Sequence, residues 1–262
     1  MIESTKNATV KAVARLRQRD EREATGLALL EGPQVVREAL GHAIESVDSL
    51  YLTTEGLGRH PELSETATAA GVEVELVSDA ALAAMADTRT PQGVLAVGRQ
   101  TPVRLRDALP PGTRLVAVLD EVRDPGNAGT IIRAADAAGA DAVILTGASV
   151  DPWNPKAIRA TTGSLFHLRI TTGVPLEAAA EAVREAGLAL VAADMRGEPL
   201  PAAPLDAPTA WLFGNEAHGL SATARRFADR SVAVPIYGSA ESLNLASAAA
   251  VCLYASAFAQ RA

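Results

Sequence analysis

Cysteine and aromatic residues are scarce in this chain of 262 residues: there is one cysteine, and phenylalanine, tryptophan and tyrosine together make up 3%. One cysteine cannot build a disulfide framework, which indicates a reducing compartment. The N-terminus lacks the charged, apolar and small-residue pattern of a signal peptide, so we expect a cytoplasmic protein. Acidic residues outnumber basic residues by 31 to 24, and this net charge of −7 argues against tight non-specific binding to nucleic acid.

Long runs of strongly apolar residues are also missing. The uncharged run Leu243–Ala259 falls short of the roughly 20 strongly apolar residues that a bilayer requires, and it is rich in alanine and serine. We therefore expect a buried helix, capped at its start by Ser242 and packed on a sheet and on a second subunit. Cys252 lies in this run between apolar neighbours, which indicates a buried hydrophobe rather than a nucleophile.

The first hundred residues alternate between strand and helix patterns and predict a small α/β sandwich, domain 1–99. Its expected strands are Leu27–Glu31, Val47–Thr53, Val72–Val77 and Val94–Val97, and its expected helices are Val10–Glu23, Gln34–Leu40, Pro61–Ala70 and Asp79–Ala86. Residues 100–113 are rich in proline without periodicity and indicate a linker to a second domain, 114–262.

The second domain restarts the alternation with continuous apolar strands, which are typical of a parallel sheet buried on both faces. Its expected strands are Leu115–Leu119, Ala142–Leu145, Leu165–Ile170, Leu188–Ala193, Trp211–Phe213 and Val232–Pro235. Its expected helices are 127–138 with Asn127 as cap, Pro155–Thr162, Leu176–Ala186, 221–228 with Ser221 as cap, and the run described above. The fold class is thus α/β with a mainly parallel sheet.

Three loops that follow apolar strands carry the chemistry: Asp120–Asn127, Gly214–Gly219 and Tyr237–Asn244. In a parallel sheet such loops share one edge, so we expect them to meet around one ligand. They contain no lysine-bearing phosphate loop, and Gly126 and Gly129 do not have the dinucleotide spacing. A nucleotide-like ligand without a pyrophosphate fits them better.

A basic segment opens this acidic protein. It carries five positive side chains and no acidic one: Lys6, Lys11, Arg15, Arg17 and Arg19. A solvated helix face and a contact with a polynucleotide explain the pattern equally well.

Three stretches, Asp120–Arg133, Leu212–Gly219 and Pro235–Ala246, resemble the three signature motifs of the SpoU/TrmH-type methyltransferases of the SPOUT superfamily. The order of the motifs is the family's order. Lys156–Ala160 with Gly163 resembles the family's intervening segment. Glu31–Gly32 and Thr90–Val97 resemble its N-terminal RNA-binding extension, an L30e-like domain.

The resemblance implies 2′-O-ribose methylation of RNA with S-adenosylmethionine, without a metal. It implies a trefoil-knotted parallel sheet in the C-terminal domain, and a homodimer formed through that domain whose active site draws on both subunits. An N-terminal domain ahead of the knot favours ribosomal RNA, and transfer RNA is the nearest alternative. A non-catalytic RNA-binding protein on the same fold is a further alternative. The missing glycine fingerprint argues against a dinucleotide-dependent oxidoreductase.

The resemblance also implies roles for individual residues. The family's cofactor positions correspond to Gly214, Ile236 and Leu245, with Leu212 and Ser242 beside them; its catalytic positions correspond to Arg133, Asn127, Glu216 and Asn244. Since a guanidinium normally stays protonated, we expect Arg133 to orient the ribose or a phosphate and to stabilise negative charge rather than act as base. Glu216 has two open interpretations: a carboxylate that receives an arginine of the partner chain or lies near the cofactor, and a carboxylate at a helix start. We expect Asp151, Trp153 and Asn154 at the mouth of the site.

Overall fold

The computed structural model describes all 262 residues, Met1–Ala262, and divides into two compact units. The first unit comprises Met1–Thr101 and Asp151–His167, and the second comprises Pro102–Val150 and Leu168–Ala262. The segment Asp151–His167 therefore packs with the N-terminal residues although it lies within the domain 114–262 that the sequence predicts. None of the helices combines the length and the apolar character needed to cross a membrane.

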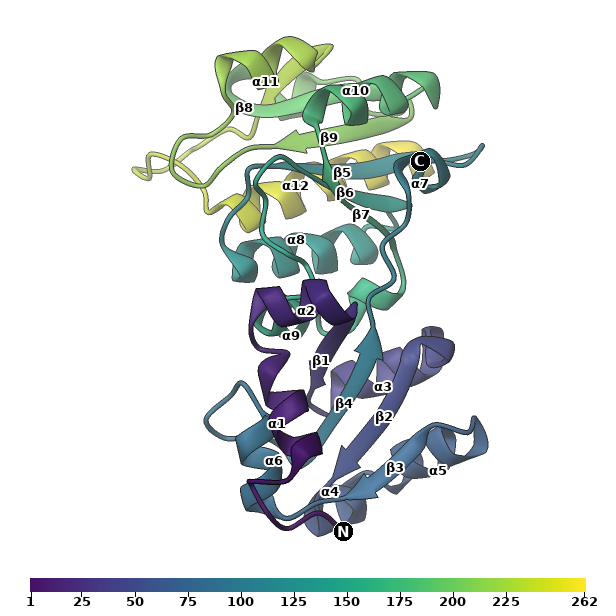
Figure 1. Ribbon diagram of the computed structural model, residues 1–262. Coiled ribbons are helices and arrows are strands. Elements are labelled where there is room, and N and C mark those ends of the chain that lie inside the picture. Colours follow the sequence, from purple (N-terminus) through teal and green to yellow (C-terminus); the bar gives the residue numbers. More distant parts are fainter. The chain divides into compact units, whose positions relative to one another are not determined.

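The first unit is a four-stranded sheet covered by helices (Figure 1). The strand order is β1 (Leu27–Glu31), β4 (Val94–Arg99), β2 (Val47–Leu52), β3 (Glu73–Leu76). β4 is antiparallel to β1 and β2, and β3 is parallel to β2. The helices are α1 (Ala8–Arg15), α2 (Arg19–Thr25), α3 (Pro33–His42), α4 (Thr54–Arg59), α5 (Pro61–Ala69), α6 (Asp79–Met85) and α9 (Pro155–Thr161), with 3₁₀ turns η1 (Ile44–Ser46) and η2 (Ser164–Phe166). The predicted sandwich and its four strands are confirmed.

The predicted single helix Val10–Glu23 is wrong, because a buried arginine breaks it. Arg22 is only 1% exposed, and its guanidinium donates hydrogen bonds of 2.9 Å to the carbonyl oxygens of Leu16 and Arg17. These carbonyls follow the end of α1, so the side chain takes the place of continued helical hydrogen bonding. The same guanidinium forms a 2.7 Å ion pair with Asp151. A sequence pattern does not reveal such a distant partner.

The second unit is a six-stranded, wholly parallel sheet, which confirms the predicted mainly parallel sheet (Figure 1). The strand order is β10 (Arg230–Ala233), β8 (Ala189–Pro199), β9 (Thr209–Phe213), β5 (Leu115–Asp120), β6 (Ala142–Thr146), β7 (Arg169–Val174). Its helices are α7 (Leu105–Ala108), α8 (Pro125–Ala137), α10 (Leu176–Glu185), α11 (Ala222–Phe227) and α12 (Leu245–Arg261), with the 3₁₀ turn η3 (Leu200–Ala202). α7 lies within the predicted linker.

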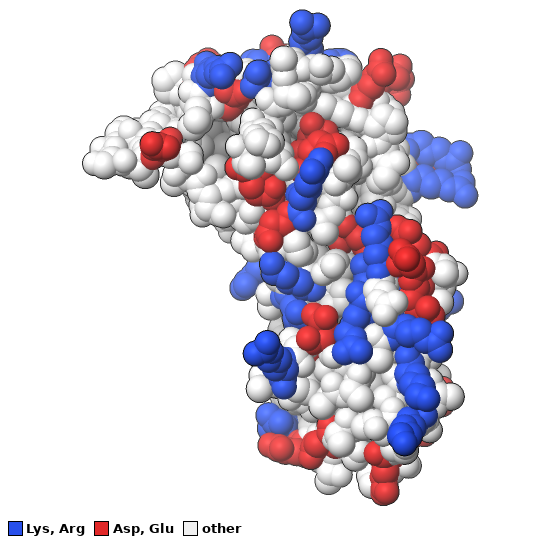
Figure 2. Space-filling view, turned by 60° about the vertical axis from the view of Figure 1, so that its left-hand side comes forward, with Lys and Arg blue, Asp and Glu red and all other residues white.

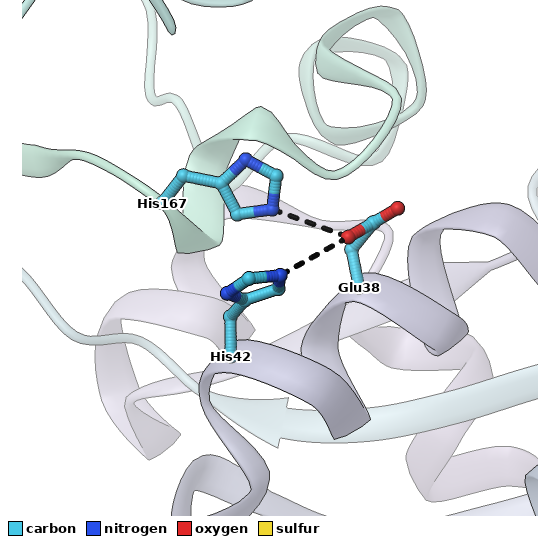
Figure 3. Close-up of side chains that lie close together, drawn as sticks. All are labelled: Glu38, His42 and His167. Carbon is cyan, nitrogen blue, oxygen red and sulfur yellow. Dashed lines mark hydrogen bonds and ion pairs between the residues drawn. The ribbon is translucent and has the colours of Figure 1, made fainter.

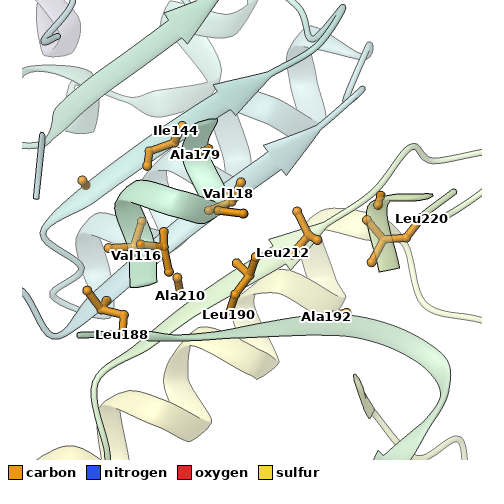
Figure 4. Close-up of a cluster of buried hydrophobic side chains, with 14 residues drawn as sticks. Val116, Val118, Ile144, Ala179, Leu188, Leu190, Ala192, Ala210, Leu212 and Leu220 are labelled. Atoms are coloured by element: carbon orange, nitrogen blue, oxygen red, sulfur yellow. The ribbon is translucent and has the colours of Figure 1, made fainter. Parts of the chain in front are cut away.

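Helices cover both faces of this sheet. On one face, α10 and α11 pack on strand residues such as Val118, Leu190 and Leu212 (Figure 4). On the other, α8 and α12 pack against the sheet, and the indole N–H of Trp211 on β9 donates a 2.9 Å hydrogen bond to Ser256 on α12. Burial raises the pKa of the Cys252 thiol on α12 to about 12, which agrees with a buried hydrophobe and not with a nucleophile.

Further boundaries differ from the prediction: β8 runs six residues beyond the predicted end at Ala193, and β10 ends at Ala233 instead of Pro235. The predicted strand Leu165–Ile170 is wrong in its first half: residues 164–166 form η2 and β7 begins at Arg169. The cap of α8 is Asp124, which accepts a hydrogen bond from the Asn127 N–H, and the cap of α12 is Asn244 rather than Ser242. Asp124 is followed by Pro125 at the first helical position, where proline needs no hydrogen-bonded N–H. As a result, the Asn127 side chain is free to bond outside its own helix.

Candidate active site

The three predicted loops meet at one edge of the second unit. The Asn127 side chain, in the first turn of α8, links the other two loops. Its Nδ2 donates a 3.3 Å hydrogen bond to Glu216 in the loop after β9. Its Oδ1 accepts a 3.1 Å hydrogen bond from Asn244 Nδ2, at the start of α12. Three of the four predicted catalytic residues are therefore joined in one chain of hydrogen bonds.

At both ends of this series of hydrogen bonds, the side chain also accepts hydrogen bonds from main-chain N–H groups at the start of a helix. The Asn244 Oδ1 accepts hydrogen bonds from the N–H groups of Ala246 and Ser247, which fixes the amide at the first turn of α12. The Glu216 carboxylate accepts from the N–H groups of Arg123 and Asp124, at 3.4 and 3.3 Å, just ahead of α8. A negative charge at a helix N-terminus is favourable. Glu216 thus binds the start of α8 and not the start of its own neighbouring helix.

A cavity of about 760 Å³ lies beside these residues. Its walls include Asp120 and Arg123 from the loop after β5, and Asn127, Glu216 and the exposed His218. Burial raises the pKa of the Asp120 carboxyl above its usual value, although Thr146 donates a 2.8 Å hydrogen bond to it.

Glu121 lines the same cavity in the left-handed backbone region. Its φ of 57° is uncommon for a residue with a side chain and marks local strain. Asn215 Nδ2 donates a 2.9 Å hydrogen bond to its carbonyl oxygen. The N–H of Ala148 and the side chain of Arg123 donate to its carboxylate and lower its pKa. The loop after β5 is therefore held by several partners in a strained conformation.

The predicted cofactor residues occupy two kinds of position. Ile236 and Ser242 line a small hollow of about 90 Å³ together with Leu243 and residues 193–195 at the centre of β8. Gly214 is buried, and an added Cβ would meet the main chain of Gly219, so glycine is required there. Leu243 lines this hollow while the next residue, Asn244, bonds to the wall of the large cavity.

Leu212 and Leu245 do not line either hollow. The Leu212 side chain is fully buried in the same core cluster as Leu190 and Leu220 (Figure 4), so only its main chain is available to a ligand. Leu245 is half-buried as the first residue of α12. The sequence motif correctly located the loops but did not separate core residues from lining residues.

Arg133 lies apart from the cavity of its own chain. It is exposed on α8, lines neither hollow, and makes no hydrogen bond or ion pair. The three residues expected at the mouth of the site belong to the first unit, where Asp151 pairs with Arg22, Trp153 is 2% exposed, and Asn154 caps α9. Their place at the mouth of the site stays a prediction.

Sequence reasoning missed Asp120, Asp124 and Asn215 as residues that shape the site. The signal for Asp124 was present, since an aspartate followed by proline is a typical helix start. No comparable signal marked Asn215, because its role depends on the neighbouring strand's loop.

The five predicted RNA-binding side chains are all exposed but differ in their partners. Arg19 forms a 2.6 Å ion pair with Glu23, and Arg17 donates to the carbonyl oxygens of Ala14 and Ala86. The side chains of three residues remain without such a partner: Lys6, Lys11 and Arg15.

Two stretches of the chain match known families. Residues 114–254 match the SpoU rRNA Methylase family, and residues 7–96 match the MRM3-like substrate binding domain. The first match covers more than half of the chain. The chain belongs to the SpoU rRNA methylase family.

Relatives of this SpoU-family protein match it over nearly its whole length. It is 38% identical over 257 residues to the 23S rRNA (guanosine(2553)-2′-O)-methyltransferase RlmP of Bacillus subtilis, with 97% of each chain covered. The AdoMet-bound rRNA methyltransferase of Sinorhizobium meliloti has 32% identity and a TM-score of 0.86, covering 97% of this chain and 96% of that one. AviRb of Streptomyces viridochromogenes, solved with AdoMet, has 33% identity and a TM-score of 0.84, covering 97% and 99%. The predicted family and fold class are confirmed.

Proposed function

We propose that this SpoU-family protein is an S-adenosylmethionine-dependent enzyme that methylates the ribose 2′-hydroxyl of a nucleotide in ribosomal RNA. The observation that carries the proposal is the hydrogen-bonded junction Glu216–Asn127–Asn244, which joins all three motif loops beside one large cavity. The full-length relatives named for 2′-O-methylation of 23S rRNA, or solved with AdoMet, support both the substrate class and the cofactor.

The residues around the small hollow fit the cofactor. Ile236 and Leu243 offer apolar contact for an adenine ring, and Gly214 allows close approach of main-chain groups. Bound S-adenosylmethionine supplies a methyl group that its sulfonium makes electrophilic. Ser242 lines the small hollow, and Asn244 two residues later bonds to Asn127 in the wall of the large cavity, so this loop is suited to orient the donor towards the ribose.

Residues beside the large cavity, together with Arg133, position the substrate. The amides of Asn127 and Asn244 are fixed by helix caps and by each other, which lets them hold a ribose without reorganisation. The hydroxyl becomes a better nucleophile as its proton passes to solvent water, and the guanidinium of Arg133 stabilises the negative charge that develops on the oxygen.

We infer that the enzyme is a homodimer through its C-terminal domain and that Arg133 serves the cavity of the partner subunit. Two observations support this arrangement. Arg133 makes no hydrogen bond or ion pair and lies outside the cavity of its own chain. The adjoining helix α12 leaves apolar side chains exposed, with Phe258 at 69% and Val251 at 42%. We further propose the family's trefoil knot for residues 114–262.

The remaining assignments follow the same proposal. Domain 1–99 binds the RNA substrate, which agrees with its match to a substrate binding domain, and residues 100–113 link it to the methyltransferase domain. A ribosomal RNA substrate also favours a cytoplasmic location.

The first test is methyl transfer to ribosomal RNA. Purified protein, S-adenosylmethionine and ribosomal RNA that lacks modifications are incubated, and 2′-O-methyl sites are mapped by mass spectrometry of nuclease fragments. We expect one dominant ribosomal site. Arg133→Ala lowers the turnover number by about 10²–10³-fold, which is the loss typical of one charge-stabilising group, while the affinity for S-adenosylmethionine measured by calorimetry stays unchanged.

Mixed dimers test whether Arg133 acts across the interface. Arg133→Ala and Glu216→Ala chains, each inactive alone, are mixed and allowed to exchange subunits. If Arg133 serves the partner's cavity, each mixed dimer contains one intact site and activity returns; if it serves its own cavity, none does. Full activity of Arg133→Ala, or methylation of transfer RNA alone, contradicts the proposed function.

A further inference from the structure

Two histidines and a glutamate cluster in the first unit (Figure 3). Glu38 and His42 lie four residues apart on α3, so their side chains project from the same face of the helix. His167 directly follows η2 and reaches the same point from a distant part of the sequence. We propose that Glu38, His42 and His167 form a binding site for a divalent transition-metal ion with the preferences of zinc.

The spacing of the donor atoms supports this site. Glu38 Oε2 lies 3.2 Å from His167 Nε2 and 3.5 Å from His42 Nε2. In a tetrahedral zinc site with ligand bonds of about 2.0–2.1 Å, neighbouring donor atoms are about 3.3 Å apart. One donor atom from each of the three residues lies within 4.8 Å of the others. The distance between the two imidazole nitrogens is the third of these distances, and rotation of the exposed His42 ring can shorten it.

The chemistry of the donors selects the ion. Two imidazoles and one carboxylate are a known protein ligand set for zinc, with a fourth position left for water. Magnesium and calcium prefer oxygen ligands alone, so a site with two nitrogen donors discriminates against them. The cluster is open enough for that water, since the His42 side chain is 54% exposed and the other two are about a quarter exposed.

Neighbouring residues hold the carboxylate in place. The second oxygen of Glu38, Oε1, accepts a 2.7 Å hydrogen bond from Gln34 Nε2, one turn earlier on α3. Such outer hydrogen bonds orient metal-binding carboxylates. Gly163, with φ of 102°, packs directly against the stem of Glu38, and an added Cβ there would collide with that side chain. The tight approach brings Glu38 close to η2 and to His167.

Without an ion, His167 Nε2 and Glu38 Oε2 share a 3.2 Å hydrogen bond, and His42 Nε2 lies 3.5 Å from the same oxygen. A metal ion bound by the two nitrogens and the carboxylate would take the place of the proton in that hydrogen bond. The bound ion would tie α3 to the segment Asp151–His167, alongside the ion pairs Arg22–Asp151 and Arg159–Glu31. The site would thus link residues 151–167, which belong to the SpoU-matching sequence, to α3 of the first unit. This inference does not depend on the proposed reaction.

Zinc binding to the tag-free, full-length protein tests the site. Zinc chloride is titrated by calorimetry and in competition with a chromogenic chelator. We expect one ion per chain, a higher melting temperature with zinc, and no effect of magnesium chloride. His42→Asn weakens zinc binding by about tenfold or more, because it removes a ligand, and Gln34→Ala weakens it by about tenfold through the outer hydrogen bond.

His60→Asn is the matched control. It leaves the same number of histidines as His42→Asn, and His60 lies near one carboxylate only, that of Glu62 at 3.7 Å. The control is expected to bind zinc as the unaltered protein does. Because the His42 side chain is more than half exposed, His42→Asn is expected to fold, which circular dichroism and the melting temperature without metal verify.

Nuclear magnetic resonance of the histidine side chains gives a second readout. Zinc is expected to shift the Nε2 resonances of His42 and His167 and to leave those of His60 and His218 unchanged. Absence of zinc binding overturns the proposal and leaves a purely hydrogen-bonded cluster. Equal loss of binding in His42→Asn and His60→Asn also overturns it, since such loss indicates non-specific binding to exposed imidazoles.

Discussion

Asp120 is a carboxylate in an unfavourable position at the end of β5. It is 9% exposed, and burial raises its pKa in the folded protein above the value of about 3.9 found in unfolded chains. At pH values below the unfolded pKa, Asp120 is protonated in both the folded and the unfolded state, and its burial then costs no stability from ionisation. As pH rises towards the folded pKa, the unfolded state ionises first, and the folded state loses relative stability.

Asp120→Asn is therefore expected to raise stability at neutral pH and to leave it unchanged near pH 3.5. The amide keeps an oxygen that accepts the Thr146 hydrogen bond but has no charge to desolvate. Urea denaturation at several pH values measures the difference. Asp206→Asn, at an exposed position, is the control and is expected to show little change at either pH. A loss of stability at neutral pH in Asp120→Asn contradicts the argument.

At the scale of elements, α12 carries two different faces. Its inner face packs on the sheet through residues such as Leu253 and Ser256, whereas Val251 and Phe258 remain exposed on the outer face. Tyr254 lies beside Phe258 and donates a 3.2 Å hydrogen bond to the carbonyl oxygen of Ala137 at the end of α8. An exposed apolar stripe beside a second helix is suited to contact with another copy of the chain.

Phe258→Glu is expected to weaken dimer formation by roughly 30-fold or more, since burying a charge at the centre of an interface costs as much as losing a binding hot spot. Light scattering behind size-exclusion chromatography at several concentrations measures the mass. Leu76→Glu, which alters an exposed apolar residue on β3, is the matched control and should leave the mass unchanged. If both variants retain the mass of the unaltered protein, α12 is not the dimer contact.

At the scale of the whole molecule, acidic residues outnumber basic residues by 31 to 24. The face drawn in Figure 2 shows positive and negative side chains interspersed, in keeping with the net charge of −7. Contact with RNA phosphates must then rest on local basic groups. Lys6, Lys11 and Arg15 at the N-terminus are exposed and lack ion-pair partners, whereas Arg19 is neutralised by Glu23.

Lys11→Gln with Arg15→Gln is expected to weaken RNA binding and flatten its salt dependence, by roughly 0.7–0.9 in logarithmic slope for each phosphate contact removed. Binding of a ribosomal RNA fragment is measured by fluorescence anisotropy over a range of salt concentrations. Arg37→Gln with Arg59→Gln removes the same charge from two ion pairs outside the basic segment and is the control. Equal slopes in both double variants exclude the basic segment as the phosphate contact.

The sequence alone determined the order and type of most elements, because periodicity, proline and glycine act between near neighbours. It predicted β1 without error, the cap Ser221 and the apolar strands of a parallel sheet. It also identified the three loops, since their residues form motifs. It did not predict the break after α1 or the caps Asp124 and Asn244, which depend on partners or on competition between nearby polar residues.

Only the tertiary structure decided which distant residues meet. Parallel strands with continuous apolar patterns look alike in sequence, so the order β10-β8-β9-β5-β6-β7 could not be derived from them. The bonds of Asn127 to Glu216 and Asn244 follow from that order. The contact of Glu38 with His167 follows instead from the packing of residues 151–167 within the first unit. The physical reason is that local propensities act over a few residues, whereas a site is assembled by packing between segments that are far apart along the chain.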